Sequence, residues 1–330
     1  MKPKRFAATA LAALFALAAC AENPVAPASS VIDAATSPSF SRASTHPYTF
    51  TRLDVPGAAQ TIPSGINARG RVVGWYVQGG VTSGFIYEAG AWTTNIVYPG
   101  ATVTQLRGIG PDGTIVGSYR NAIEPTTVPF HGFILTTDGV FIAVNFPGHV
   151  NNVTQRILPD GTLLGCYHDG DTMGSMHGAA YTRETYEEPL SGEGYSSLDN
   201  PGSMTDGGTP GGRKLTGQVQ TNGIQRAFVI DDGVFTAFDA PGSSATIAWD
   251  MNPAGTVVGL FVAAGTTHGF VLEHWRVVNG EVTGDYTTIN YPNSAYTDVF
   301  GINASGDIVG KFRETATGPF HGYIATRKTE

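Results

Sequence analysis

The most informative segment reads Gly301-Ile302-Asn303-Ala304-Ser305-Gly306-Asp307-Ile308-Val309-Gly310-Lys311-Phe312, and a loop leads from it to His321-Gly322-Tyr323-Ile324. Two short apolar runs are joined by a turn in which Gly306 is free to take a positive φ. Apolar runs bounded by Gly and Asn are typical of strands. The segment therefore predicts an antiparallel pair of strands, with a third strand at the His-Gly-Tyr phrase.

The same pattern recurs six times along the chain. Its second strand has a central glycine, and these glycines are spaced 42 to 52 residues apart: Gly74, Gly117, Gly165, Gly217, Gly259 and Gly310. Propeller blades repeat about every 40–50 residues. The spacing predicts an all-β, six-bladed β-propeller of four-stranded blades over residues 48–330, and argues against an open solenoid or a sandwich.

The phase of the repeat predicts how the ring closes. Each unit has four strands, and the fourth ends in an Asp/Asn-x-Pro-Gly corner, whose Pro and Gly favour a tight turn. The chain begins with a lone fourth strand at residues 48–55 and ends with the first three strands of the last unit. We expect the N-terminal strand to complete the last blade, because this leaves no blade unpaired at either end.

The fourth repeat departs most from the pattern. Gly211-Gly212-Arg213-Lys214 replaces the Gly-Ile-Asn turn, and Arg226 stands where the other repeats have His. The pattern therefore does not support a first strand in this repeat.

The amino-terminal segment is a targeting sequence rather than part of the fold. Lys2, Lys4 and Arg5 precede an uncharged Ala/Leu-rich stretch at residues 6–19, shorter than the about 20 apolar residues that span a bilayer. It ends in Leu17-Ala18-Ala19-Cys20, which resembles the lipobox of bacterial lipoproteins. The resemblance implies a signal peptide over residues 1–19 and lipidation of Cys20. Residues 20–47, rich in Ala, Pro, Ser and Thr, would then form a flexible tether.

The repeats resemble the bacterial extracellular repeat family named for its His-Ala-Phe (HAF) motif. The resemblance covers residues 48–326 and is carried by the Gly-Ile-Asn, Val-Val-Gly-x-Tyr, His-Gly-Phe and Asp-x-Pro-Gly phrases. Gly replaces the Ala of the motif at Gly132, Gly178, Gly269 and Gly322. The resemblance implies secretion and a repeat fold, and it implies no activity.

Composition narrows the range of partners. Without residues 1–19 the formal charge changes from -8 to -11, and no basic cluster follows the leader. Nucleic-acid binding needs clustered Lys and Arg, so the composition argues against a nucleic-acid partner. With Cys20 lipidated, Cys166 has no partner for a disulfide and is interpreted as one side chain on a strand. We expect a monomer that meets the membrane only through its anchor, with a glycan or an envelope protein as ligand.

Two sets of repeated polar residues have a structural and a functional interpretation. His131, His177, His268 and His321 occupy equivalent places, as do the corner residues Asp54, Asn145, Asp199, Asp239 and Asn290. A ring of metal ligands or of carboxylates is the functional alternative. Equivalent positions on different blades lie far apart, so we favour hydrogen bonds of the histidines to backbone and capping of the corners.

Departures from the repeat are better candidates for a site, because the fold does not require them. In the third repeat, His168, Asp169, Asp171 and His177 are weak candidates for holding Ca²⁺, although their spacing fits no standard motif. Otherwise no cofactor is expected. The long connection at residues 182–195 contains Glu184, Glu187, Glu188 and Glu193, and we interpret it as a solvated loop. The connection at residues 273–285 predicts a long hairpin with a buried Trp275.

No nucleophile elbow, P-loop, His-Glu-x-x-His or dinucleotide motif is present. The sequence therefore favours a non-catalytic binding or scaffolding propeller anchored to the envelope. One alternative is a carbohydrate-active hydrolase or lyase with its site at the channel mouth, and another is a structural or adhesive envelope protein. Convergent carboxylates or histidines at the mouth would indicate the enzyme, and a large exposed aromatic patch the adhesin.

Overall fold

The computed structural model describes residues 48–121, 130–146, 148–149, 151–169, 175–181 and 195–328. Strands dominate this part of the chain, and within it no helix is long and apolar enough to cross a membrane. In chain order the strands are β1 (Tyr48–Arg52), β2 (Gln60–Ile66), β3 (Val72–Gln78), β4 (Val81–Glu88), β5 (Ala91–Ile96), β6 (Ala101–Ile109), β7 (Ile115–Asn121), β8 (His131–Leu135), β9 (Phe141–Val144), β10 (Asn151–Ile157), β11 (Leu163–His168), β12 (Met176–Tyr181), β13 (Tyr195–Pro201), β14 (Ser203–Gly208), β15 (Lys214–Thr221), β16 (Ile224–Asp231), β17 (Val234–Phe238), β18 (Ala245–Met251), β19 (Val257–Ala263), β20 (Thr266–Val278), β21 (Glu281–Ile289), β22 (Tyr296–Ile302), β23 (Ile308–Arg313) and β24 (His321–Arg327).

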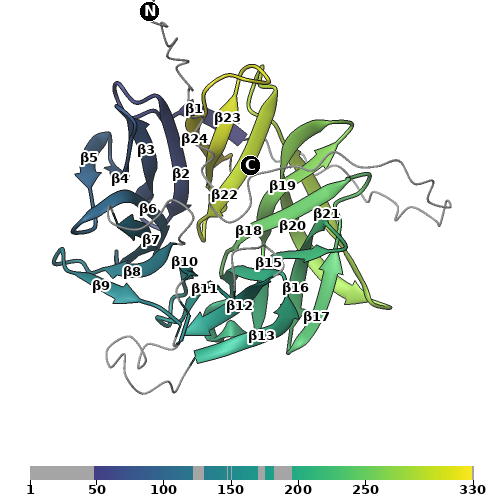
Figure 1. The fold of residues 1–330 in the computed structure, drawn as a ribbon. Coiled ribbons are helices and arrows are strands. Elements are labelled where there is room, and N and C mark those ends of the chain that lie inside the picture. The colour runs from purple at the N-terminus through teal and green to yellow at the C-terminus, as the bar shows by residue number, and fades with distance from the viewer. Residues whose placement is uncertain are drawn as a thin grey trace, which may run out of the picture.

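The described strands pair in six consecutive antiparallel sets of four, which confirms the predicted β-propeller. We number the blades along the chain: β2–β5, β6–β9, β10–β13, β14–β17, β18–β21, and last β22–β24 with β1. The first strands of the six blades contact one another in succession, and β22 contacts β2 to complete the circle. Figure 1 shows the sets following one another around a centre.

The ring closes as the phase of the repeat predicts. β1 pairs antiparallel with β24, in a register that runs from Tyr48 opposite Arg327 to Arg52 opposite Tyr323. Just beyond the strand, the Leu53 amide donates to the Gly322 carbonyl oxygen at 2.8 Å. The aromatic ring of Phe50 packs edge-on against Tyr323, 5.5 Å between centroids. The N-terminal strand is therefore the fourth strand of blade 6.

The fourth repeat has a first strand, β14, so the doubt that the sequence raised about this strand was wrong. β14 pairs with β15 over its whole length, and the pair has the same kind of bulge as other blades. Gly207-Gly208-Thr209 stands in the place of Gly-Ile-Asn. The backbone amide of Thr209 donates to the Lys214 carbonyl oxygen at 2.9 Å, just as the backbone amide of Asn252 donates to the Thr256 carbonyl oxygen at 3.0 Å in blade 5. The sequence 210–212 forms a short 3-10 turn after it. Ladder pairing uses backbone groups, so the strand forms without the motif.

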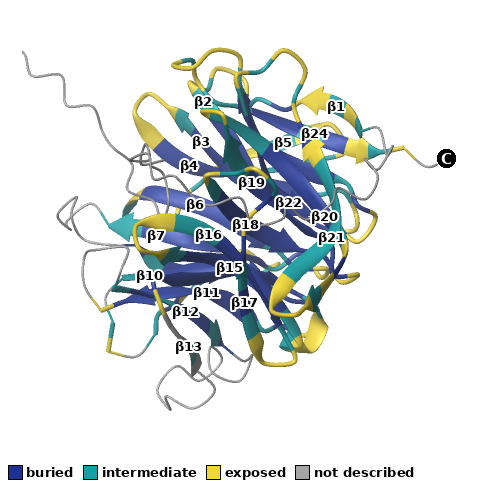
Figure 2. Cartoon of the chain, turned by 90° about the vertical axis from the view of Figure 1, so that its right-hand side faces the viewer, coloured by how far each residue is buried: buried dark blue, intermediate teal, exposed yellow. Residues whose placement is uncertain are grey.

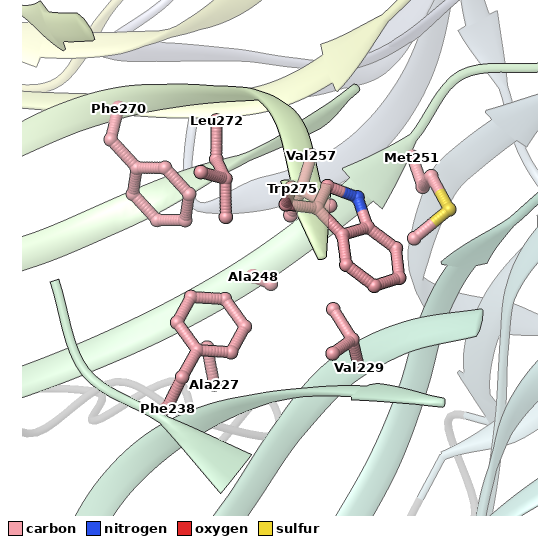
Figure 3. Close-up of a cluster of buried hydrophobic side chains, with 9 residues drawn as sticks. All are labelled: Ala227, Val229, Phe238, Ala248, Met251, Val257, Phe270, Leu272 and Trp275. Atoms are coloured by element: carbon pink, nitrogen blue, oxygen red, sulfur yellow. The ribbon is translucent and has the colours of Figure 1, made fainter. Parts of the chain in front are cut away.

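The apolar core is distributed between neighbouring blades. Figure 2 shows the strand interiors as buried, with exposed residues concentrated at the turns. Figure 3 shows one cluster, in which Ala227 and Val229 of blade 4 face Ala248, Phe270 and other side chains of blade 5. Burial of one large apolar side chain contributes about 1.5–3 kcal/mol. Because each cluster joins two or three blades, the apolar core holds the ring together as well as each sheet.

Candidate functional site

The repeated histidines lie at one face of the ring, the corner face, where the fourth strands turn into the next first strands. His321 Nδ1 lies 3.0 Å from Asp54 Oδ2, and His268 Nδ1 lies 2.8 Å from Asn290 Oδ1. In blade 4 the exceptional Arg226 donates to Asp239 Oδ2 at 2.9 Å. These three pairs tie the third strand of a blade to its own corner. For His321 and His268 the expected hydrogen bond to backbone is therefore wrong, because the partner is the corner side chain.

The remaining corners follow the same logic in part. Asn145 Oδ1 accepts a hydrogen bond from the Gly132 amide at 3.3 Å, beside His131. Asp199 lies on β13, where its side chain is outside the described residues. Blade 4 has the pair Arg226–Asp239 where blade 5 has His268–Asn290. Both pairs place a nitrogen-bearing side chain of the third strand beside an oxygen of the corner side chain, which explains why Arg226 can replace the histidine of the repeat.

The candidate Ca²⁺ residues are only partly brought together. Asp169 Oδ2 lies 2.9 Å from His177 Nε2, and its Oδ1 lies 3.1 Å from His149 Nδ1, a residue that the sequence did not single out. His168 instead is buried, with its Nε2 3.8 Å from Cys166 Sγ. Asp171 lies outside the described residues. Across the described ranges, no three His, Cys, Asp or Glu side chains are grouped so as to hold a metal.

Three other predictions concern single segments. Cys166 is a buried side chain on β11, in agreement with its interpretation as one side chain on a strand. Trp275 is 6% exposed and donates to the Gly255 carbonyl oxygen at 2.7 Å, so its predicted burial is confirmed. The glutamates of the 182–195 connection, Glu184, Glu187, Glu188 and Glu193, lie outside the described residues.

The centre of the ring is built by a β-bulge in each first strand. The bulge follows the residue that pairs with the central glycine of the second strand, and the extra residues are Ser64, Arg107, Gln155, Asp206, Trp249 and Phe300. Side-chain contacts with a neighbouring blade are made by Ser64, Arg107, Gln155, Trp249 and Phe300. Arg107 Nη1 donates to Gln155 Oε1 at 3.1 Å. The Trp249 and Phe300 rings stack with 5.0 Å between their centroids. Bulges re-aim side chains, and here they fill the axis.

The residue after the bulge marks the narrowest part of the ring. It is Gly in four blades, and a Cβ on Gly65, Gly108, Gly207 or Gly301 would lie 2.3–3.2 Å from backbone of the next first strand. Blades 3 and 5 have Arg156 and Asp250 at this position instead. Arg156 Nε lies 3.2 Å from Asp250 Oδ1, so the two exceptions form an ion pair. This signal was present in the sequence, because Arg156 and Asp250 carry opposite charges and both stand at a position that is Gly in the other four repeats.

Both members of the ion pair also form hydrogen bonds with backbone groups around the axis. Arg156 also donates to the Arg107 carbonyl oxygen at 2.7 Å and to the carbonyl oxygen of Phe300 in blade 6. Asp250 Oδ2 accepts from the Ile302 amide at 3.1 Å. Burial raises the pKa of Asp250, whereas the charge of Arg156 and the amide hydrogen bonds act in the opposite direction. Arg156 thus reaches from blade 3 to blade 6 and blocks the axis.

Above this pair lies an axial pocket of about 100 Å³. It opens on the turn face, which we define as the face where the first strands end, at Ile66, Ile109, Ile157, Gly208, Met251 and Ile302. All six blades contribute to its lining, which consists mainly of aliphatic residues and prolines together with three asparagines, and Arg156 and Asp250 are its charged side chains. At its rim, Asn303 donates to the Asn67 carbonyl oxygen at 3.4 Å and Asn252 to that of Asn303 at 3.2 Å.

A second, lateral pocket of about 340 Å³ adjoins the axial one on the turn face. The two share Asn252 and Ala304 in their walls. The lateral pocket lies among blades 4, 5 and 6, and its charged or titratable lining residues are Lys214, Glu273, His274 and Arg327. Trp275 also lines it, with the Lys214 ammonium 4.3 Å from the centroid of its ring. The sequence missed Lys214 and Arg327, because the blades that bring them together are distant in the chain.

Comparison with known proteins gives the fold. No family model and no curated protein matches the sequence. The structure is similar to that of putative TolB from Agrobacterium tumefaciens, with a TM-score of 0.51 and 15% identity over 82% of this chain and 91% of that chain. TolB from Acinetobacter baumannii gives a TM-score of 0.45 and 12% identity over 76% of this chain and 61% of that one. The β-propeller domain of the Trilobed protease from Pyrococcus furiosus gives a TM-score of 0.43 and 13% identity over 82% of this chain and 98% of that one. Similarity at these identities shows the β-propeller fold alone.

Proposed function

We propose that this chain is an exported, lipid-anchored propeller of the HAF-repeat type, which binds or scaffolds an envelope component without catalysis. The observation that carries the proposal is the closed axis, where Arg156 and Asp250 neutralise each other beneath a mouth lined mainly by aliphatic residues, prolines and three asparagines. A carboxylate committed to an arginine and to two amides is a poor acid or base. Such a mouth offers a surface for contact with a partner rather than groups for acid–base catalysis.

The carbohydrate-active alternative has less support. Glycoside hydrolysis uses two carboxylates about 5–9.5 Å apart at the scissile bond. Among the described residues that line the axial pocket, Asp250 is the one carboxylate. We therefore do not propose hydrolysis, and a positive hydrolysis assay would establish this alternative instead.

The adhesive alternative requires a continuous exposed apolar patch. The large apolar side chains that are exposed in the described ranges are five valines and one isoleucine, on different turns and connections: Val81, Val97, Val140, Ile224, Val234 and Val278. Aromatic residues are not among them. Single exposed aliphatic residues are normal for any domain, and this supports binding through the pockets instead.

The proposed function is tested by a binding screen. A soluble form, residues 44–330, would be offered immobilised glycans and fractions of an envelope extract, and would be assayed in parallel for glycan cleavage. We expect retention of one component with no cleavage product. Cleavage of a glycan, or retention of nothing in any fraction, would reject the proposal.

The anchor is tested separately. Cys20→Ser should abolish incorporation of labelled fatty acid and leave an unprocessed precursor, because the thiol is the acyl acceptor in a lipobox. Firm anchoring takes more than one chain, since each buried methylene contributes about 0.8 kcal/mol. Equal labelling of the variant and the parent would contradict the lipoprotein assignment.

A further inference from the structure

The lateral pocket is made largely by segments that depart from the repeat. Lys214 follows the divergent turn of the fourth repeat. Residues 273–275 belong to a bulge of β20, where the pairing shifts between Glu273 and Arg276 and His274 takes a φ of 51°. The bulge turns Trp275 inward to Gly255, whereas His274 is turned outward and is 2.9 Å from Asp285. Bulges are enriched next to functional sites because they re-aim side chains.

Lys214 brings available hydrogen-bond donors into this pocket. Its ammonium group lies over the Trp275 ring, which holds it in place. Among the described residues the ion-pair partner of Lys214 is Asp231, and Asp231 Oδ2 is 3.6 Å from Nζ, beyond hydrogen-bonding distance. An ammonium has three donors and no acceptor. A fixed cation with unused donors in a pocket wall favours an oxyanion.

Blade 6 supplies a second, more constrained cation to the lining, Arg327. Arg327 Nη1 and Nη2 donate to the two carboxylate oxygens of Glu273 at 2.9 and 3.3 Å, which fixes the guanidinium. Gly306 makes room for it, since a Cβ there would lie 3.0 Å from Arg327 Cδ. Ser305 and Thr256 add neutral hydroxyl groups to the lining. The lining therefore has two cations, one carboxylate and several neutral polar groups.

We infer that the lateral pocket binds an acidic monosaccharide, a polyhydroxylated molecule whose carboxylate or phosphate group is held by Lys214. The pocket volume of about 340 Å³ falls at the small end of the ligand-pocket range, about 300–1,000 Å³. The hydroxyl groups of Ser305 and Thr256 suit the hydroxyl groups of a sugar. This inference rests on the proposed binding function and gives it a ligand class.

The test compares three sugars of similar size by calorimetric titration of the full chain. Glucuronate and glucose 6-phosphate have an oxyanion, and glucose is the neutral control. We expect one of the anionic sugars to bind at least about tenfold more tightly than glucose, because a charge-assisted hydrogen bond is worth roughly this factor. Which one binds identifies the source as carboxylate or phosphate. Equal binding of all three, or binding of neither anionic sugar, would overturn the inference.

Variants locate the binding. Lys214→Met keeps an apolar stem on Trp275 but removes the charge, and should weaken anion binding about tenfold or more. Lys214→Arg should retain it, and Arg69→Met, which removes an exposed cation from blade 1, should change nothing. Unchanged affinity in Lys214→Met would refute the inference. If Lys214→Met still retains its component in the envelope screen, the lateral pocket is rejected while the binding function stands.

Discussion

At the scale of single residues, the repeat is explained by steric contact rather than by chemistry. A Cβ on the central glycine of any second strand would lie 1.8–2.2 Å from a carbonyl oxygen of the first strand, at the bulge. In four blades the aromatic side chain of the His-Gly-Phe or equivalent phrase would lie 2.7–2.9 Å from the same Cβ, as Phe133 would from a Cβ on Gly117. The bulge, the glycine and the aromatic ring therefore form one packing unit, and this is why the three motifs recur together.

Gly259→Ala should destabilise the protein strongly. Its Cβ would lie 1.9 Å from the Ile247 carbonyl oxygen, which is backbone and cannot move without disturbing the bulge. Overpacking of this kind costs about 3 kcal/mol. The matched control is Gly318→Ala, whose nearest neighbour is the rotatable Thr315 hydroxyl at 2.8 Å. Thermal melts should show a large loss for the first variant and little for the second, and equal losses would contradict the steric explanation.

The axial ion pair should behave as a coupled unit. Arg156→Met leaves a buried carboxylate without its cation, and Asp250→Leu leaves a buried guanidinium without its anion, so each should cost about 3–5 kcal/mol. Combined in one chain, they should cost less than the sum, because neither charge is then left alone. Urea unfolding of the parent, the two single variants and the double variant measures the coupling. Strict additivity would show that the pair does not stabilise the axis as a unit.

At the scale of elements, the turns after the first strands join blades to one another. Asn67 Oδ1 accepts from the Arg69 and Arg71 amides at 3.0 and 3.1 Å, while its Nδ2 donates to the Gly110 carbonyl oxygen of the next blade at 3.4 Å. Asn252 and Asn303 make the same set of contacts. The Asn of Gly-Ile-Asn thus caps its own turn and links blades 5, 6, 1 and 2, the part of the ring that contains the closure.

The closing strand should make stability fall at alkaline pH. Tyr48 of β1 donates to the Gly306 carbonyl oxygen at 3.2 Å, and burial raises the pKa of its phenol from 10.0 to about 12. Above pH 10 the unfolded chain loses this proton while the folded chain keeps it, so the free energy of unfolding decreases as pH rises towards 12. Tyr48→Phe should be about 1 kcal/mol less stable at pH 8 and should decline less steeply. Urea unfolding at pH 8, 10 and 11 tests this, and parallel declines would count against it.

At the scale of the whole molecule, stability depends on joining the two ends of the chain. β1 contributes five residues of main-chain pairing to β24. The Leu53 and Val55 side chains that follow it pack in a cluster with Ile66, Val72 and others of blade 1. The N-terminal segment is therefore part of two blades at once, although it lies some 270 residues from β24 in the chain.

Deleting residues 44–57 should remove most of the stability of the ring. Four or five hydrogen bonds at about 1 kcal/mol each, with the apolar burial of Leu53 and Val55, approach the 5–15 kcal/mol of a typical domain. Deleting residues 21–41, the predicted tether, should have almost no effect on the melting temperature. Two truncations of equal stability would mean that the strand does not hold the ring closed.

The sequence by itself determined the architecture, because a period of some 45 residues with constant turn chemistry admits few folds, and because its phase leaves one strand missing at the end and one spare at the start. It also favoured a structural role for the histidines and corner residues, since they are equivalent positions on the third and fourth strands, outside the first strands that surround the axis. It failed at the first strand of blade 4, where backbone pairing replaces the motif.

Only the tertiary structure decided what occupies the axis and the pockets. Arg156 and Asp250 are 94 residues apart in the chain and look like isolated exceptions until the ring sets them 3.2 Å apart. Lys214, Glu273 and Arg327 come from three blades, and a bulge that no local motif announces shapes the pocket between them. Repetition encodes the contacts that every blade shares, whereas a site depends on differences between blades, whose distances are defined only when the ring closes.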